Sequence, residues 1–141
     1  MALNEEVFKN FINTCRGFNY LVGTKVRQAR DGNSVLEVEL RPELCNRWGM
    51  PHGGVIFTLA DTAAGVAAMS AGERRTVTAN AHMNYLRCGV SEGKMTAHGK
   101  TVKAGKTLAF VDVEVFDAAG ELVATGQFTM AYSGEKIPEM K

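Results

Sequence analysis

Apolar residues recur at helical spacing in the first segment of the chain, LNEEVFKNFINTC. Asn4 stands at the expected N-cap, and Glu5 and Glu6 fall in the first turn, where a helix favours negative charge. The apolar positions that share one face are Leu3, Val7, Phe8, Phe11, Ile12 and Cys15. The spacing predicts a short amphipathic N-terminal helix within residues 1–17, lying on a larger body.

Apolar and polar residues then alternate with a period of two in YLVGTKVRQARDGNSVLEVEL, residues 20–40. Leu36, Val38 and Leu40 alternate with Glu37 and Glu39, which is typical of a strand with one solvated face. A turn at residues 31–33, Asp-Gly-Asn, divides the segment into two strands of a hairpin.

Residues 54–70 form the most hydrophobic segment, and its apolar residues cover nearly the whole circumference of a helix. Such a helix is normally buried. Gly72, in the sequence Ala-Gly-Glu at 71–73, is the expected C-terminal cap. We do not expect the segment to span a membrane, because it contains Asp61, is rich in Ala and Gly and has no flanking anchors.

Four strand-like segments follow at residues 76–87, 93–103, 106–117 and 121–132, joined by turn-like sequences. Short joints between consecutive strands predict an antiparallel meander. The expected architecture is therefore α+β: a long central helix wrapped by a five- to six-stranded antiparallel sheet, in a single domain over residues 1–141 with a C-terminal tail at 133–141. A sheet with open edges favours self-association, so we expect at least a dimer.

Composition narrows the possible partners and the compartment. The net charge is +1 and 45% of residues are hydrophobic, so no global field favours nucleic acid or an anionic membrane. The three cysteines, Cys15, Cys45 and Cys88, are odd in number and fit free thiols in a reducing compartment. The acidic N-terminus lacks the apolar core of a signal peptide. We therefore expect a cytoplasmic protein with no nucleic-acid or membrane partner.

Asp61 is a single carboxylate inside the apolar helix, and burying it costs several kcal/mol unless it is paired or solvated. No Lys or Arg lies within a turn or two of it. One interpretation places it on a narrow polar stripe, bonded to Thr58 or Thr62. The other places it in a partly dry cleft as a chemical group.

The turn before this helix, Pro-His-Gly-Gly, favours the chemical interpretation. Free N–H groups at a helix start, with glycines that allow close approach, can stabilise an oxyanion or polarise a carbonyl. Gly54 and Asp61 are seven residues apart, or roughly 10 Å along a helix. One carbonyl therefore does not reach both groups in the same chain, and we hypothesise that Asp61 acts in a site shared with a second subunit.

The pattern N-x-x-G-x-x-H-G-G followed by an apolar helix with an Asp is formed by Asn46, Gly49, His52, Gly53, Gly54 and Asp61. With KAGKTLAFVDVEVFD and GELVATGQFTM further along, it resembles the PaaI-like hotdog-fold acyl-CoA thioesterases, relatives of 4-hydroxybenzoyl-CoA thioesterase, over residues 18–132. The resemblance implies a hotdog fold, acyl-CoA as substrate, and dimers or dimers of dimers with sites at the subunit interface.

The resemblance also implies roles for single residues. Asp61 is expected to act as general base or nucleophile on the thioester carbon, and the Gly53 N–H to polarise its carbonyl. Asn46 is expected to position the thioester or the attacking water, His52 to organise the turn, and Thr78 to orient water. No metal or redox cofactor is expected, because an activated thioester needs only a carboxylate, an oxyanion donor and water.

Other residues are expected to contact the substrate. The resemblance places the CoA moiety against Gly54, Tyr85, Lys103, Ala104, Gly105, Lys106, Thr107 and Leu108, with the two lysines available to its phosphates. The apolar residues expected around the acyl group are Met50, Val55, Phe57 and Leu59, together with Phe8, Phe11 and Phe18. These walls favour aryl or medium-chain acyl groups.

Several alternatives remain open. A hotdog hydratase or dehydratase, or a non-catalytic acyl-CoA-binding protein, could share the fold and the cleft. A Cys45 nucleophile lacks a supporting arrangement, and a zinc site built from Cys45, His52, His82 and His98 lacks ligand spacing. No G-x-S-x-G serine motif is present, and AGKT at 104–107 has Ala where a P-loop requires Gly.

Overall fold

The computed structural model describes residues 4–137, which form three α-helices, a short 3₁₀ turn and six strands. The helices are α1 (Glu5–Thr14), α2 (Phe18–Val22) and α3 (Gly53–Gly72), and the 3₁₀ turn is Pro42–Leu44. The strands are β1 (Lys25–Arg30), β2 (Asn33–Glu39), β3 (Arg74–Tyr85), β4 (Lys94–Ala104), β5 (Leu108–Phe116) and β6 (Leu122–Lys136).

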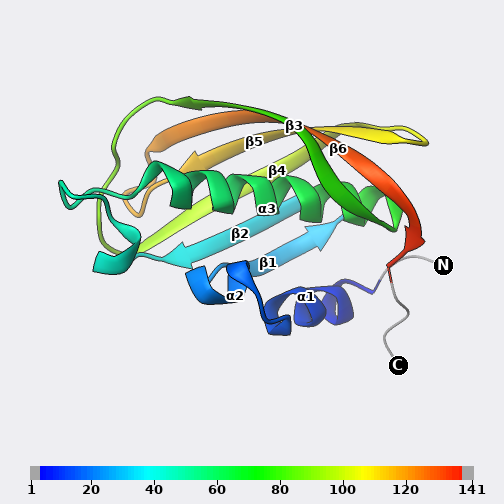
Figure 1. The fold of residues 1–141 in the computed structure, drawn as a ribbon, viewed down its shortest axis with the longest axis horizontal. Coiled ribbons are helices and arrows are strands. Elements are labelled where there is room, and N and C mark those ends of the chain that lie inside the picture. Colours follow the sequence, from blue (N-terminus) through cyan, green and yellow to red (C-terminus); the bar gives the residue numbers. More distant parts are fainter. Residues whose placement is uncertain (1–3, 138–141) are drawn as a thin grey trace.

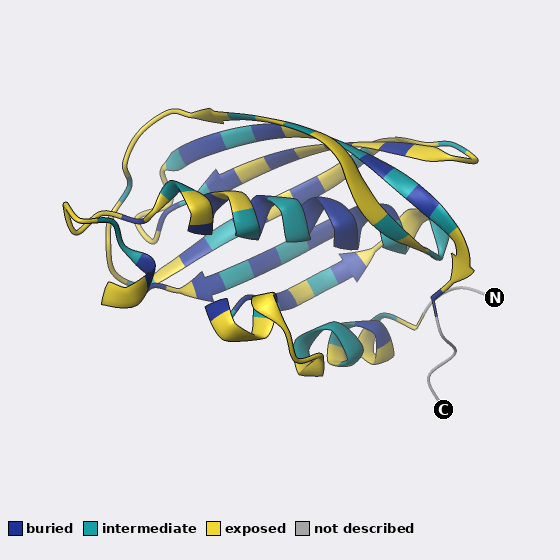
Figure 2. Ribbon diagram, in the orientation of Figure 1, coloured by how far each residue is buried: buried dark blue, intermediate teal, exposed yellow. Residues whose placement is uncertain are grey.

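A single antiparallel sheet in the order β1-β2-β4-β5-β6-β3 curves around α3 (Figure 1). This confirms the predicted helix wrapped by a sheet. The buried faces of the strands and of α3 meet in one core (Figure 2). Helix and sheet approach closely at Gly99, where an added Cβ would lie 2.7 Å from the Ala63 carbonyl oxygen, and the buried Ser34 hydroxyl donates to that same oxygen at 2.7 Å.

The predicted meander is wrong at one joint. β3 does not pair with β4 but crosses to the far edge of the sheet, where it pairs with β6 from Arg74↔Lys136 to Tyr85↔Ala124. The sequence of the joint between β3 and β4 is turn-like, which predicts that the two strands pair. The joint is instead an eight-residue connection across one end of the molecule, long enough to carry the chain from the edge of the sheet to its middle.

Local details also differ from the sequence predictions. Tyr20–Val22, expected in the first strand, belongs to the helix α2. The C-cap of α3 is Glu73, with a left-handed φ of 56°, rather than Gly72. Gly72 instead makes room for Tyr132, since an added Cβ would lie 2.5 Å from its ring. β6 continues to Lys136, so the predicted tail begins later, and residues 138–141 lie outside the described part.

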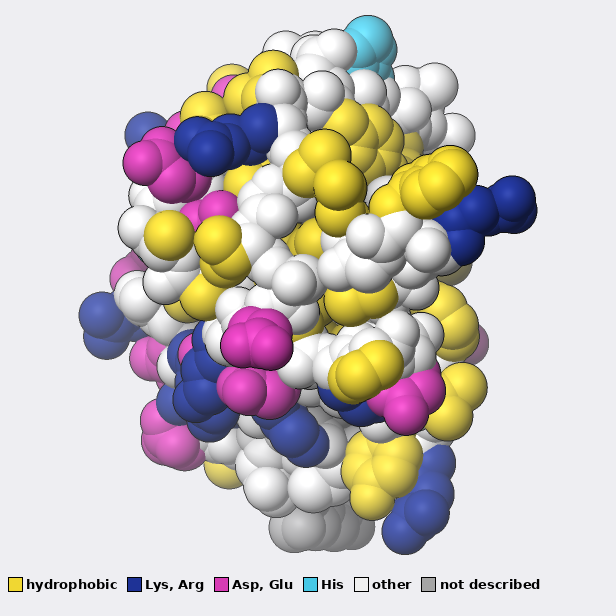
Figure 3. Space-filling view, turned by 90° about the vertical axis from the view of Figure 1, so that its left-hand side faces the viewer, with side chains coloured by type: hydrophobic (Ala, Val, Ile, Leu, Met, Phe, Trp, Pro, Cys, Tyr) yellow, Lys and Arg dark blue, Asp and Glu magenta, His cyan; other side chains and the backbone are white. Residues whose placement is uncertain are grey.

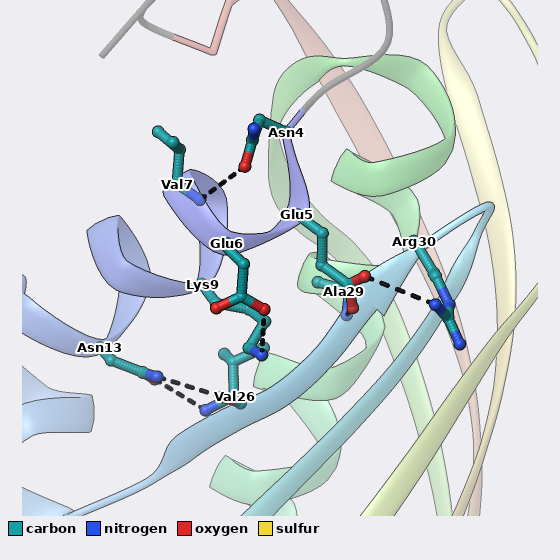
Figure 4. Close-up of polar contacts among 9 residues, drawn as sticks. All are labelled: Asn4, Glu5, Glu6, Val7, Lys9, Asn13, Val26, Ala29 and Arg30. Atoms are coloured by element: carbon teal, nitrogen blue, oxygen red, sulfur yellow. Dashed lines mark hydrogen bonds and ion pairs between the residues drawn. The ribbon is translucent and has the colours of Figure 1, made fainter. Parts of the chain in front are cut away.

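The two edges of the sheet differ in how they are covered. At the β1 edge, the Asn13 side chain accepts from the Val26 N–H at 2.7 Å and donates to the Val26 carbonyl at 3.0 Å. Glu5 accepts from the Ala29 N–H at 3.0 Å and lies near Arg30 (Figure 4). α1 thus caps the edge that β1 would otherwise leave open. The opposite edge, β3, has no strand beyond it in the described chain.

α3 is long and apolar enough to cross a membrane by length and composition alone. In this fold 56% of its most hydrophobic 18-residue window is buried against the rest of the chain. α3 also packs against all six strands, β1 to β6, so its apolar side chains are buried inside the protein, as in a core helix.

Asp117 is a buried carboxylate that ties the β5–β6 turn to the β3–β4 connection. It accepts from the N–H groups of Ala119 and Glu121 at 3.0 Å and of Val90 at 3.1 Å. Burial by itself raises the pKa of Asp117, but these three donors and the nearby Arg87 outweigh it, and the pKa is lowered. The charged form is therefore the one that the fold stabilises.

Asp117→Asn is expected to lower the free energy of unfolding by about 1–3 kcal/mol at pH 7, because an amide nitrogen then faces an N–H donor. Since folding lowers the pKa, the contribution is complete above the unfolded value of about 3.9 and is lost as the pH falls through the folded value. Urea unfolding at pH 7 and pH 3 should show the difference between wild type and variant shrinking in acid. Equal stabilities at pH 7 would contradict this role.

Candidate active site

The loop before α3 is shaped by Asn46. Its side-chain oxygen accepts from the backbone N–H groups of Trp48 at 2.9 Å and Met50 at 3.1 Å. The backbone N–H of Asn46 donates to the Met50 carbonyl at 2.7 Å. The oxygen of the amide is thus used inside the loop. Its nitrogen has no acceptor among residues 4–137, so it is the half of the amide available to a ligand or a water.

α3 begins at the Pro-His-Gly-Gly turn. His52 is the N-cap, and its Nδ1 accepts from the Gly54 N–H at 2.8 Å. A Cβ on Gly54 would lie 2.9 Å from that nitrogen, which explains the second glycine. Because the Gly54 N–H already donates to His52, the free donor at the start of α3 is the Gly53 N–H, which meets no acceptor in the described chain.

Tyr85 fixes the first turn of α3 from the end of β3. Its hydroxyl donates to the Gly53 carbonyl oxygen at 3.0 Å, and its ring lies 3.5 Å from the position of a Cβ on Gly53. Partial burial raises the pKa of Tyr85, so the hydroxyl stays a donor at neutral pH. The structure therefore places Tyr85 beside Gly53 and away from the segment Lys103–Leu108, although both were expected to contact the CoA moiety.

Asp61 lies two turns further along α3 and is half-buried. Its Oδ1 accepts a 2.6 Å hydrogen bond from the Thr78 hydroxyl on β3. The partners suggested for a polar stripe are wrong, because Thr58 and Thr62 donate to the backbone carbonyls of Gly54 and Thr58. Oδ2 accepts no hydrogen bond from the described residues, and no cation pairs with Asp61 there. One carboxylate oxygen is fixed and the other is free to act.

The segment Lys103–Leu108 forms the β4–β5 hairpin at the other end of α3. Its turn is held by the Arg74 guanidinium, which donates to the Lys106 carbonyl at 2.6 Å, and by the Tyr132 N–H, which donates to the Thr107 carbonyl at 2.9 Å. Arg74 begins β3 just after α3 ends. The hairpin and Gly53 are therefore separated by the length of a 20-residue helix, about 30 Å.

The residues predicted to line an acyl pocket separate into two groups. Phe8, Val55 and Leu59 are buried in the core of the single chain. Phe18, Met50 and Phe57 are exposed, and Phe11 is half-buried. Along α3, sequence periodicity could not distinguish Phe57 from Val55 and Leu59, because apolar residues occupy nearly every face of that helix.

Sequence reasoning also missed the side chain of Asn19. Its Oδ1 lies 2.8 Å from the Thr62 hydroxyl, whose one hydrogen is shared with the Thr58 carbonyl at the same distance, and this contact connects α2 to the helical turn that carries Asp61. The signal available in the sequence was Gly17 and Gly23, which flank α2 and both adopt positive φ.

The surface of the described chain is hollowed in at least two places. One is on the outer face of the sheet, away from α3, and includes His82, His98 and Glu114. The other adjoins the Asn46 loop and includes Cys45, Asn46 and Arg47. Neither contains Asp61, and the outer one contains none of the predicted site residues.

Comparison with known proteins shows the family of this chain. The family model of the thioesterase superfamily matches residues 49–124, which include His52, Gly53, Asp61 and Thr78. Acyl-coenzyme A thioesterase 13 of Pongo abelii is 32% identical over 122 residues, covering 81% of this chain and 84% of that protein.

Solved structures show the same fold. The smu.793 protein of Streptococcus mutans, bound to acetyl CoA, is 30% identical with a TM-score of 0.78 and covers 88% of this chain and 97% of its own. The PaaI protein of E. coli, from the phenylacetic acid degradation operon, superposes with a TM-score of 0.82 at 23% identity, covering 94% of this chain and 99% of its own. The predicted hotdog architecture is confirmed by these neighbours.

Proposed function

The chain belongs to the thioesterase superfamily and is a thioester hydrolase, and we propose that it cleaves aryl- or medium-chain acyl-CoA to the free acid and CoA with Asp61 as the catalytic carboxylate. The observation that carries the proposal is the state of Asp61: it is half-buried, held by Thr78 through one oxygen, and has no partner among residues 4–137 at the other. Three free cysteines suit a cytoplasmic location.

The chemistry needs two complementary groups. The Gly53 N–H, at the positive end of the α3 dipole, is the donor for the thioester carbonyl oxygen as it becomes an oxyanion. Asp61 removes a proton from the attacking water, or attacks the carbonyl carbon itself. In either case the carbon–sulfur bond breaks and the CoA thiolate leaves, taking up a proton.

The neighbouring residues position these groups. Thr78 fixes the carboxylate through Oδ1 and so leaves Oδ2 available for the reaction. His52 caps the helix, which holds the Gly53 N–H outward. The free amide nitrogen of Asn46 is available to donate to the thioester or to the water, and Tyr85 keeps the first turn of α3 in place.

We further propose that the site is shared between two chains. Gly53 and Asp61 are eight residues apart on one helix, about 12 Å, so one thioester cannot contact both within a chain. The uncovered β3 edge offers the place for a second copy, since α1 caps the other edge. β3 has 12 residues and carries Val77, whose side chain is 65% exposed. Such an edge favours pairing with another chain.

Antiparallel pairing of β3 with a second β3 reverses the direction of the partner's α3. The two-fold axis then moves the middle and the far end of the partner's helix toward the Gly53 end of this one. The partner's Asp61 and the partner's Lys103 would complete the site, the first at the carbonyl and the second beside the CoA phosphates. We expect a dimer as the smallest active unit, with pairs of dimers forming tetramers.

A direct test is thiol release by the wild-type protein from acetyl-, octanoyl-, benzoyl- and phenylacetyl-CoA, with product acids identified by mass spectrometry. We expect release with the aryl or octanoyl substrates. Binding of the same compounds without thiol release would identify a non-catalytic acyl-CoA-binding protein. Water added to an enoyl-CoA with the thioester intact would identify a hydratase. Either result would contradict the proposed activity.

A further inference from the structure

β3 contains one residue more than the part of β6 beside it. Thr78 lies opposite Met130 of β6. Two residues further along β3, Asn80 lies opposite Thr129, which is the immediate neighbour of Met130. Ala79, between Thr78 and Asn80, has no partner in the ladder and is therefore the extra residue of a β-bulge.

The bulge separates two parts of β3 that both contact the proposed site. Before it, the Thr78 hydroxyl donates to Asp61 Oδ1 at 2.6 Å. After it, the Tyr85 hydroxyl donates to the Gly53 carbonyl at 3.0 Å. Thr78 and Tyr85 are seven residues apart, and a regular strand places residues at an odd separation on opposite faces. The unpaired Ala79 accounts for both side chains reaching α3.

Core packing does not explain the bulge. Residues 77–80 are exposed in the single chain, whereas partly buried and exposed residues alternate in the neighbouring parts of β3. The strand curves along the uncovered edge of the sheet (Figure 1). It ends at the face drawn in Figure 3, where α3 also begins and where apolar side chains reach the surface. The extra residue therefore lies beside the proposed site and outside the core.

The direction of the Thr78 side chain matters because its hydroxyl has two acceptors within reach. Asp61 Oδ1 is 2.6 Å away, and the sulfur of Met130, the residue directly opposite in the ladder, is 3.7 Å away. A hydroxyl has one hydrogen to donate. A bulge bends its strand, increases the local twist and can re-aim a side chain beside an active site. The bend next to Thr78 therefore bears on which acceptor receives the hydrogen.

We propose that Ala79 is a positioning residue: its bulge turns Thr78 toward Asp61 while the rest of β3 holds Tyr85 on Gly53. This inference rests on the proposed function, because fixing Oδ1 of the carboxylate is what leaves Oδ2 available to react. A straight strand cannot aim at both places. Tyr85 is also held by its ring, which lies 3.5 Å from the position of a Cβ on Gly53, so the Thr78 contact is the one that a straight strand loses.

Deletion of Ala79 tests the proposal, because every paired residue of β3 can keep its partner on β6. We expect kcat to fall by about 10- to 100-fold, the scale of a catalytic group misplaced by an ångström, with KM within about threefold. Thr78→Val should cause a similar loss. Adding the deletion to Thr78→Val should then cost less than about threefold more, because both changes remove one hydrogen bond. Losses that multiply in the double variant overturn the proposal.

Deletion of Arg27 is the matched control. Arg27 is the extra residue of a bulge in β1, at the opposite edge of the sheet, since Val26 and Gln28 lie opposite consecutive residues of β2. Its deletion should leave kcat within about threefold, because the two sites share no partner. An equal loss in both deletions would show a general effect of disturbing an edge strand. A deletion of Ala79 that unfolds the chain or sediments as a smaller species would assign the bulge to folding or assembly. Either result overturns the proposal.

A crystal structure of the Ala79 deletion gives a readout that does not depend on activity. The distance from the Thr78 hydroxyl to Asp61 Oδ1 is 2.6 Å in the wild type. In the deletion it should exceed about 3.5 Å, the limit of a hydrogen bond, and an unchanged distance overturns the proposal. A failure of the proposed function is distinguishable, because Asp61→Asn at the wild-type rate would refute the catalytic role while the distance still reports whether the bulge aims Thr78.

Discussion

Asp61→Asn is expected to lower kcat at least about a hundredfold on every thioester that the wild type cleaves, which is the scale of a lost acid–base group. The change keeps the size of the side chain and an oxygen that can accept from the Thr78 hydroxyl, now 2.6 Å away. It removes the charge with which the unpartnered oxygen activates water or attacks carbon. Thiol release over a range of substrate concentrations would separate kcat from KM.

Asp112→Asn provides the matched control. Asp112 is exposed on β5 and lines the hollow on the outer face of the sheet, which contains none of the predicted site residues. The same loss of one carboxylate there should change kcat less than twofold, roughly the effect of a surface substitution. If Asp61→Asn loses no more activity than Asp112→Asn, Asp61 is not the catalytic group.

Gly53→Pro is expected to lower kcat by about 10²- to 10³-fold, the usual effect of removing one oxyanion donor. Proline removes the N–H and yet suits this position, because the first residue of a helix is where proline is favoured. His52, which precedes it, already has the extended backbone that a residue before proline needs, with φ −66° and ψ 136°. The helix should therefore form without its donor.

Gly53→Ala distinguishes a need for the N–H at this position from a need for a residue without a side chain. It retains the N–H, and its Cβ would sit 3.5 Å from the Tyr85 ring, an ordinary contact. We expect it to retain most of the wild-type kcat. Equal losses in the alanine and proline variants would show that the site needs the small residue rather than the N–H, and the oxyanion assignment would be withdrawn.

Much of the fold was predictable because the periods of the sequence are clear. A 20-residue apolar helix can only be buried, and the strands that follow are the only cover for it. The position of β3 was not predictable, because pairing with β6 depends on which edge the sheet leaves open rather than on the residues of the β3–β4 joint. The helix α2 was missed for a related reason, since Arg41 and Asn19 hold it from distant segments.

The candidate site was predictable in its residue types and less so in its arrangement. Asp61 was singled out because no cation in its own helix could compensate for burial, and the structure supplies a Thr78 hydroxyl instead. No local pattern could show that His52 consumes the Gly54 N–H and leaves Gly53 as the free donor. That distinction follows from capping geometry, which a sequence alone does not specify.

The central claim is that Gly53 of one chain acts with the Asp61 of its partner. Co-expression of Asp61→Asn chains and Gly53→Pro chains, each with a different affinity tag, allows isolation of heterodimers by two successive purifications. Such a dimer has one site with both lesions and one with neither, so we expect about half of the wild-type kcat per dimer, given two equivalent sites. Heterodimers no more active than the better parent variant would show that both residues act within one chain.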